Sequence, residues 1–65
     1  MYPNLVKAMR EKNITEKKIS ELLGMPYTTV RDRTRGTYSF TFEQAMKINR
    51  ELFPEYDSET LFKTK

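Results

Sequence analysis

Two short helical patterns separated by a glycine constrain this chain more than any other feature of its sequence. The first pattern opens at Thr15, whose hydroxyl can cap a helix N-terminus, and continues as an apolar stripe at helical spacing. Gly24 then suits the left-handed conformation that ends many helices. Pro26 suits the first turn of the next helix, where its missing amide hydrogen costs little. Residues 15–36 are therefore predicted to form two short helices joined by a tight turn, with Met25 filling the turn.

The second of these helices, predicted at residues 27–35, has one firm apolar anchor, Val30, and a wide polar face. At about 100° per residue, one face gathers Tyr27, Thr28, Arg31, Asp32 and Arg35. A helix with so little to bury gains little stability from its own packing. We therefore expect neighbouring helices to hold it in place, so that its polar face can contact a ligand.

Residues 15–36 resemble the helix-turn-helix of the phage Cro and repressor family, the XRE-like regulators. The residues that carry the resemblance are Ile19, Leu23, Gly24, Met25, Val30 and Gly36. The opening MYPNL and the later FTFEQAMKINRELFPEYDSETLF are also similar to small phage-type members, so the likeness covers nearly the whole chain. It implies a lambda-repressor-like DNA-binding domain that represses transcription. The departures from the family pattern are Glu16 for a common Gln, Ser20 for a usual Ala, and Arg33 and Thr34 where an apolar residue is expected.

The size and composition of the chain limit what else it can be. Its 65 residues make one small domain, residues 1–65, with a marginal core. It contains no cysteine and no histidine, which removes disulfides, thiolate metal sites and the commonest general base. Neither a membrane span nor a signal-peptide pattern is recognisable. We expect a cytoplasmic protein that is not an enzyme and needs no metal or cofactor.

The positive charge is concentrated in the half of the chain that carries the two paired helices. Residues 1–36 hold eight Lys or Arg against four Asp or Glu, a balance of +4, whereas residues 37–65 hold four against five, a balance of −1. This is the electrostatic footprint expected of a nucleic-acid binder. Ordinary solvated surface explains so modest an excess equally well.

The flanking segments predict the remaining helices. The first should open at Pro3 or Asn4 and stop at Asn13. After the loop at residues 36–39, Thr41 and Gln44 have the spacing of a capping box. The core positions predicted for the helix that follows are Phe42, Ala45, Ile48 and Leu52, and a last short helix should run from Asp57 or Ser58 through Phe62. The fold class is thus predicted as an all-α compact bundle of four to five short helices.

The candidate DNA contacts follow from the polar face and its neighbours. Base edges in the major groove are expected to meet Tyr27, Thr28, Arg31 and Asp32, because early residues of a recognition helix reach the bases. The phosphate contacts are expected from Thr15, Lys17, Lys18, Arg35 and Tyr38. Three alternatives stay open: the whole face is merely solvated, Lys18 is plain surface, or Tyr38 packs as a cover over Val30.

The four phenylalanines, Phe40, Phe42, Phe53 and Phe62, are predicted to lie in the core rather than to form a platform for single-stranded bases. Glu51 and Glu55 have the spacing of an exposed helical pair, and without a cleft they offer little acid–base chemistry.

The function predicted from these features is sequence-specific binding of double-stranded DNA. The alternative is a small, antirepressor-like protein-interaction module whose basic face binds an acidic partner. One recognition helix reads few base pairs, so a weak homodimer on two-fold-related half-sites is expected. Its surface is predicted around Phe53, Tyr56, Leu61 and Phe62, unless these side chains only close the core of one chain.

Overall fold

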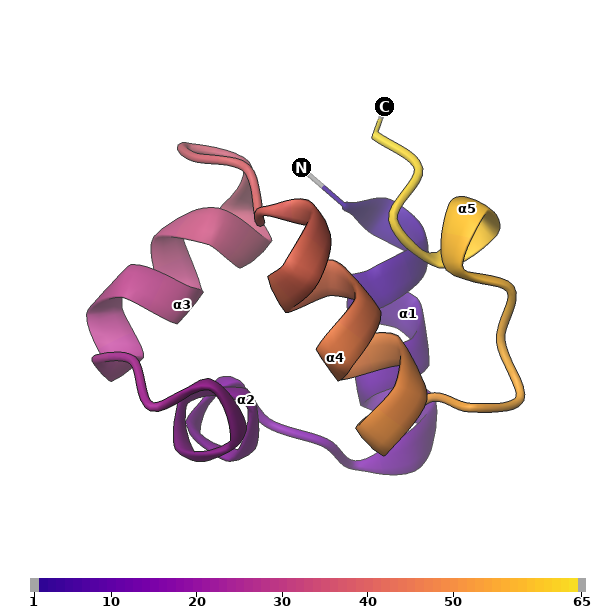
Figure 1. Ribbon diagram of the computed structural model, residues 1–65, viewed down its shortest axis with the longest axis horizontal. Helices are drawn as coiled ribbons and strands as arrows, with labels where there is room; N and C mark the ends of the chain where they lie inside the picture. The colour runs from indigo at the N-terminus through magenta and orange to yellow at the C-terminus, as the bar shows by residue number, and fades with distance from the viewer. Residues whose placement is uncertain (1, 65) are drawn as a thin grey trace.

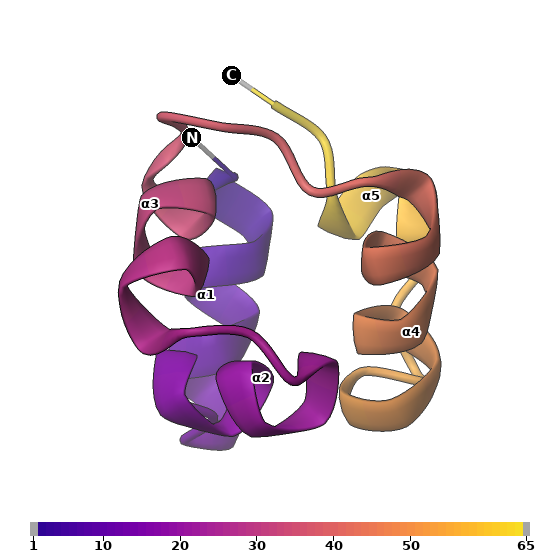
Figure 2. The same ribbon diagram turned by 60° about the vertical axis from the view of Figure 1, so that its left-hand side comes forward.

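Five α-helices account for most of residues 2–64, the part of the chain that the computed structural model describes (Figure 1). In chain order they are α1 (Pro3–Lys12), α2 (Glu16–Leu23), α3 (Tyr27–Arg35), α4 (Phe42–Leu52) and α5 (Ser58–Leu61). Helix α2 packs against both α3 and α4, while α5 packs against α1 and α4. Figure 2 shows α4 and α5 on one side of the molecule and α1 and α3 on the other. The structure confirms the predicted small all-α bundle.

Local capping chemistry sets the helix ends where the sequence predicted them. Helix α1 ends at Asn13, which is left-handed at φ 56°. The Thr15 hydroxyl accepts a hydrogen bond from the Lys18 amide at 3.3 Å and opens α2. The predicted capping box opens α4: the Gln44 amide donates to the Thr41 hydroxyl at 3.2 Å, and the Thr41 amide donates to the Gln44 side chain at 3.0 Å. The starts of α2 and α4 are therefore explained by residues within one turn of them.

The core draws apolar side chains from all five helices and from the loops between them. The largest fully buried side chains are Leu5, Ile19, Val30, Ile48, Phe53 and Leu61. Beside them, the rings of Tyr2, Phe40 and Phe62 form a triangle with centroids 5.6 to 6.0 Å apart. The Tyr2 hydroxyl accepts a hydrogen bond from the Phe40 amide at 3.0 Å. This cluster fastens the segment before α4 to the start of α1.

The prediction that Phe42 lies in the core is wrong. Its side chain is 79% exposed, whereas Phe40, two residues earlier, is buried. The intervening Thr41 has the extended conformation of a helix cap, and the chain turns into α4 immediately after it. Phe40 therefore takes the core position, and Phe42 begins α4 on the outer side.

Two of the four residues around which a dimer surface was predicted lie in the core of a single chain. Phe53 and Leu61 are completely buried in a single chain, and Tyr56 and Phe62 are partly buried against the same core. The ring of Tyr56 packs edge-on against Phe53 with centroids 5.7 Å apart. The structure thus agrees with the alternative that these side chains close the core of one chain, although Tyr56 and Phe62 keep part of their surface in solvent.

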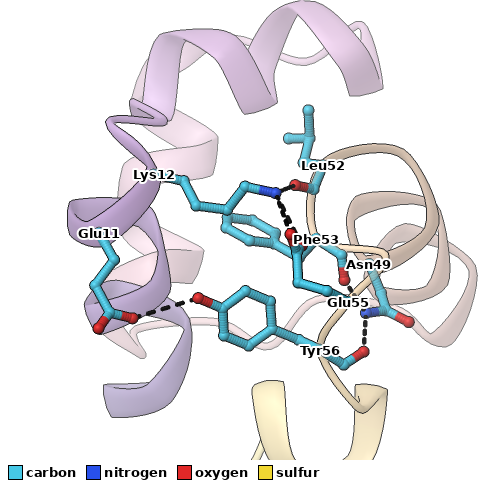
Figure 3. Close-up of polar contacts among 7 residues, drawn as sticks. All are labelled: Glu11, Lys12, Asn49, Leu52, Phe53, Glu55 and Tyr56. Atoms are coloured by element: carbon cyan, nitrogen blue, oxygen red, sulfur yellow. Dashed lines mark hydrogen bonds and ion pairs between the residues drawn. The ribbon is translucent and has the colours of Figure 1, made fainter.

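A set of polar contacts attaches the turn after α4 to the end of α1 (Figure 3). The Lys12 ammonium donates to the Leu52 carbonyl at 2.7 Å and to both Glu55 carboxylate oxygens at 2.8 and 3.1 Å. It also lies 5.4 Å from the centroid of the Phe53 ring. Because α4 ends at Leu52, Glu55 is outside the helix and does not form the predicted exposed pair with Glu51.

Acid should weaken this attachment. The hydrogen bond from Lys12, with a second from its own backbone, lowers the pKa of Glu55. A carboxyl whose pKa is depressed on folding contributes stability above its unfolded pKa and loses it as pH falls through the folded value. We expect Glu55→Gln to flatten the decline in unfolding free energy below about pH 5, measured by urea titration across pH. The control Glu21→Gln, at an exposed position without an ion pair in residues 2–64, should leave that decline unchanged.

The packing of α3 predicts a second stability effect. Val30 is fully buried and is the main apolar contact of α3 with the core. Val30→Ala should lower the unfolding free energy by about 1–2 kcal/mol through the burial lost with two methyl groups. Thr28→Ala, at an exposed position of the same helix, is the matched control in denaturant titrations. A Val30→Ala protein as stable as the control would show that the placement of this helix face is wrong.

Candidate nucleic-acid interface

Helices α2 and α3 are joined by a turn of three residues, Gly24, Met25 and Pro26. Gly24 is left-handed at φ 66°, and no atom lies within 4 Å of where its Cβ would be. Glycine is therefore favoured by backbone conformation and not by crowding. The Met25 amide donates to the Ser20 carbonyl at 3.1 Å, and its sulfur accepts from the Gln44 side chain of α4 at 3.4 Å. The turn is thus held from both sides.

Ser20, which departs from the family pattern, is buried in this packing without leaving its hydroxyl unpaired. Its side chain is buried, and its hydroxyl donates to the Lys17 carbonyl of the same helix at 2.6 Å. A buried hydroxyl with a partner within its own helix leaves nothing unsatisfied where α2 packs against its neighbours.

Two buried side chains hold α3, where the sequence pattern predicted one. Besides Val30, Thr34 is only 3% exposed. Its hydroxyl donates to the Val30 carbonyl at 2.9 Å. The polar group of Thr34, at a position where an apolar residue was expected, therefore has its hydrogen bond within the helix. At the other end of α3, the Tyr27 hydroxyl donates to the Glu16 carboxylate at 3.3 Å. Glu16, a second departure, thus links the starts of α2 and α3.

The predicted base-contacting residues all reach solvent. Tyr27 is 46% exposed and Thr28 is exposed. The side chains of Arg31 and Asp32 are 37% and 44% exposed and face each other with an Nε to Oδ1 distance of 3.9 Å. The pair is long and partly in solvent, so it contributes little and is readily exchanged for another partner. A carboxylate is accommodated among these cations because Arg31 offsets its charge.

Four of the predicted DNA contacts line one hollow beside α3. Its volume is about 660 Å³, and these four, Thr15, Lys17, Tyr27 and Arg35, line it together with Glu16, Thr34 and, from α1, Val6 and Met9. The start of α2 thus meets the two ends of α3, with α1 beside them. The other five predicted contacts do not line this hollow: Lys18, Thr28, Arg31, Asp32 and Tyr38. Within residues 2–64, neither Lys17, Lys18 nor Arg35 forms an ion pair.

The loop after α3 is held by a contact that the sequence did not reveal. The Arg33 guanidinium donates to the Ser39 carbonyl across the turn that begins at Gly36, which is left-handed at φ 93°. The only sequence signal was an Arg where an apolar residue was expected. Tyr38 lies on this loop and is 63% exposed, so it does not serve as a buried cover over Val30.

Other types of site find little support in the described part of the chain. Within residues 2–64, no three His, Cys, Asp or Glu side chains are grouped to hold a metal ion. In the same residues, every helix is too short or too polar to cross a membrane. Comparison with known proteins identifies no relative: no protein-family model, curated protein or solved structure matches this chain.

Proposed function

We propose that this protein is a helix-turn-helix transcriptional regulator of the phage Cro/repressor type, which binds double-stranded DNA through α3 and represses transcription. In this proposal α3 enters the major groove, and Tyr27, Thr28, Arg31 and Asp32 meet the edges of the base pairs. An arginine can bond the two acceptors of guanine, and a carboxylate can accept from cytosine. The role as a repressor comes from the family resemblance.

The observation that supports the proposal best is how α3 is held. A helix of nine residues is anchored by two buried side chains, Val30 and Thr34, and by the neighbouring α2. Its remaining surface carries arginines, an aspartate, threonines and a tyrosine that the core does not use. A helix supported in this way exposes hydrogen-bonding groups at fixed positions, which is what the reading of base edges requires.

Three of the five proposed phosphate contacts, Thr15, Lys17 and Arg35, line the same hollow. Lys17, Lys18 and Arg35 have no carboxylate partner within residues 2–64 and are free to neutralise phosphates. Thr15 accepts a hydrogen bond as a helix cap, and its hydroxyl hydrogen can still donate to a phosphate. Tyr38 extends the same set from the loop after α3. Such contacts fix the position of the protein on the duplex but read no sequence.

The salt dependence of binding to random-sequence duplex tests the proposal. Three neutralised phosphates predict a slope of log K against log salt of about −2.7 per copy, at about −0.9 each. Lys17→Ala should reduce the slope by about one contact. Lys63→Ala, at an exposed position after α5, is the matched control and should not change it. Equal effects of the two variants, or no duplex binding at low salt, would favour the acidic-protein alternative.

A further inference from the structure

Phe42 is the most exposed large apolar side chain in the described part of the chain, at 79%. The two others that are well exposed, Tyr27 and Tyr38, belong to the proposed DNA interface. Phe42 has no such role, because it begins α4, while α3 lies on the other side of the molecule (Figure 2). A single exposed phenylalanine is ordinary, whereas one that belongs to a contiguous apolar patch marks an interaction surface.

Phe42 belongs to a larger surface, which we call the α4 outer face. Around a hollow of about 440 Å³ it comprises Leu23 from the end of α2 and, from α4, Phe42, Glu43, Gln44, Met46, Lys47 and Arg50. Phe42 and Met46 are one helical turn apart, so their side chains lie one above the other. Leu23 and Met46 are only partly buried. The centre of this face is therefore apolar and its edges are charged.

Two of the three charges on this face, Glu43 and Arg50, complement a reversed copy, while the third, Lys47, lies close to the middle of the face. Glu43 lies near the start of α4, whereas Lys47 and Arg50 lie one and two turns further along. Seven residues separate Glu43 from Arg50, which places both on the same side of the helix. A two-fold axis passing near Met46 would set each Glu43 opposite Arg50 of a second copy. It would also lay each Phe42 ring along the aliphatic stem of the opposite Arg50.

We propose that the α4 outer face is a two-fold self-association surface, whose partner is a second copy of this chain. A partner of uniform charge would match only one end of the face, whereas an antiparallel copy matches both. The existing pair of Arg50 with Glu51 does not oppose this arrangement. It is 3.5 Å long, and its side chains are 70% and 50% exposed, so the exchange of partners costs little.

The small size of the face sets the expected affinity. One face of an 11-residue helix offers less than the roughly 800 Å² per partner found in stable complexes. Free copies should therefore associate weakly and pair readily only when adjacent half-sites hold them together at an effective concentration on the order of 1 mM. No residue of α3 lines the face, so pairing leaves the proposed DNA-reading residues uncovered. This inference names the partner surface that the proposed function requires, but it can be tested without DNA.

Charge reversal provides the test, by sedimentation equilibrium and NMR titration of the free protein up to about 1 mM. Glu43→Arg and Arg50→Glu should each weaken self-association about tenfold or more, because each places two like-charged pairs at the two-fold interface. An equimolar mixture of the two variants should associate about as well as the unmodified protein, because both pairs across the mixed interface are again opposite in charge. A mixture no stronger than either variant alone would overturn the proposal. So would an unmodified protein that stays monomeric throughout the titration.

Phe42→Ser tests the apolar centre of the face, with Tyr38→Ser as a matched exposed aromatic elsewhere. Only Phe42→Ser should weaken association, and circular-dichroism melting of both variants should show an intact fold. Equal effects would overturn the proposal. Binding to random duplex separates this failure from that of the proposed function. If Phe42→Ser keeps the salt slope of duplex binding while no variant alters association, the self-association surface is wrong and DNA binding stands. If the mixture of charge-reversed variants associates but no variant binds duplex, DNA binding is wrong and the self-association surface stands.

Discussion

Arg31→Ala is expected to weaken binding to the preferred duplex by about 1–3 kcal/mol, or about 5- to 150-fold, with little change in stability. The guanidinium lies on the outward side of α3, its nearest carboxylate is Asp32 at 3.9 Å, and the side chain is 37% exposed. This pair is long, and the Arg31 Nε that forms it is buried without a hydrogen bond, so its loss removes little from the fold. Loss of a bidentate contact to a base removes specificity at that base pair.

The measurement requires the preferred sequence, which selection from a pool of random duplexes can supply. Affinity for that duplex and for random duplex should then be compared between the unmodified protein, Arg31→Ala and Arg10→Ala. Arg10 is an exposed arginine of α1 that lines neither hollow, so its loss should change neither affinity strongly. If Arg31→Ala instead lowered the melting temperature strongly and kept the same site preference, Arg31 would be a structural residue.

The helix boundaries could be predicted because the interactions that set them are local. Thr15 caps an amide three residues away, the Thr41 and Gln44 box closes within one turn, and Gly24 needs only its own backbone conformation. None of these depends on what the rest of the chain does, so residue type and spacing carry the information. For the same reason, Val30 could be identified as an anchor of α3 from the pattern of that helix alone.

Contacts between distant segments could not be predicted in this way. Lys12 and Glu55 are 43 residues apart, and nothing near either residue indicates the other. Phe40 and Phe42 both suit a core by residue type, and only the direction in which the chain enters α4 decides between them. The candidate site shows the same limit. Tyr27 and Lys17 could each be proposed from the helical pattern, but their shared hollow depends on how three helices pack.

Asn49 illustrates the importance of such a contact, and its replacement should destabilise the fold at least as much as Val30→Ala. Its side-chain amide donates to the carbonyls of Phe53 and Tyr56, both at 2.8 Å, in the turn that follows α4 (Figure 3). One amide thus bonds two carbonyls in a segment outside the helices, and that of Phe53 also accepts from the Tyr56 amide at 3.1 Å. Asn49→Ala removes both donors and should lower the unfolding free energy by about 1–3 kcal/mol. In a domain of this size that corresponds to about 4–20 °C in melting temperature.

The comparison with Asn49→Asp separates hydrogen bonding from packing, because aspartate keeps the shape of the side chain. At neutral pH a carboxylate would face two carbonyl oxygens and repel both, so this variant should be less stable than Asn49→Ala. The same repulsion would raise the pKa of the new carboxyl, and a protonated carboxyl can donate to one of the carbonyls. A raised pKa gives stability that is present at low pH and lost as pH rises through the folded value. Urea titrations should therefore show the deficit of Asn49→Asp relative to Asn49→Ala shrinking as pH falls from 7 to about 4. A deficit that is constant with pH would mean that Asn49 acts by filling space, and the two hydrogen bonds would then not be what closes the turn.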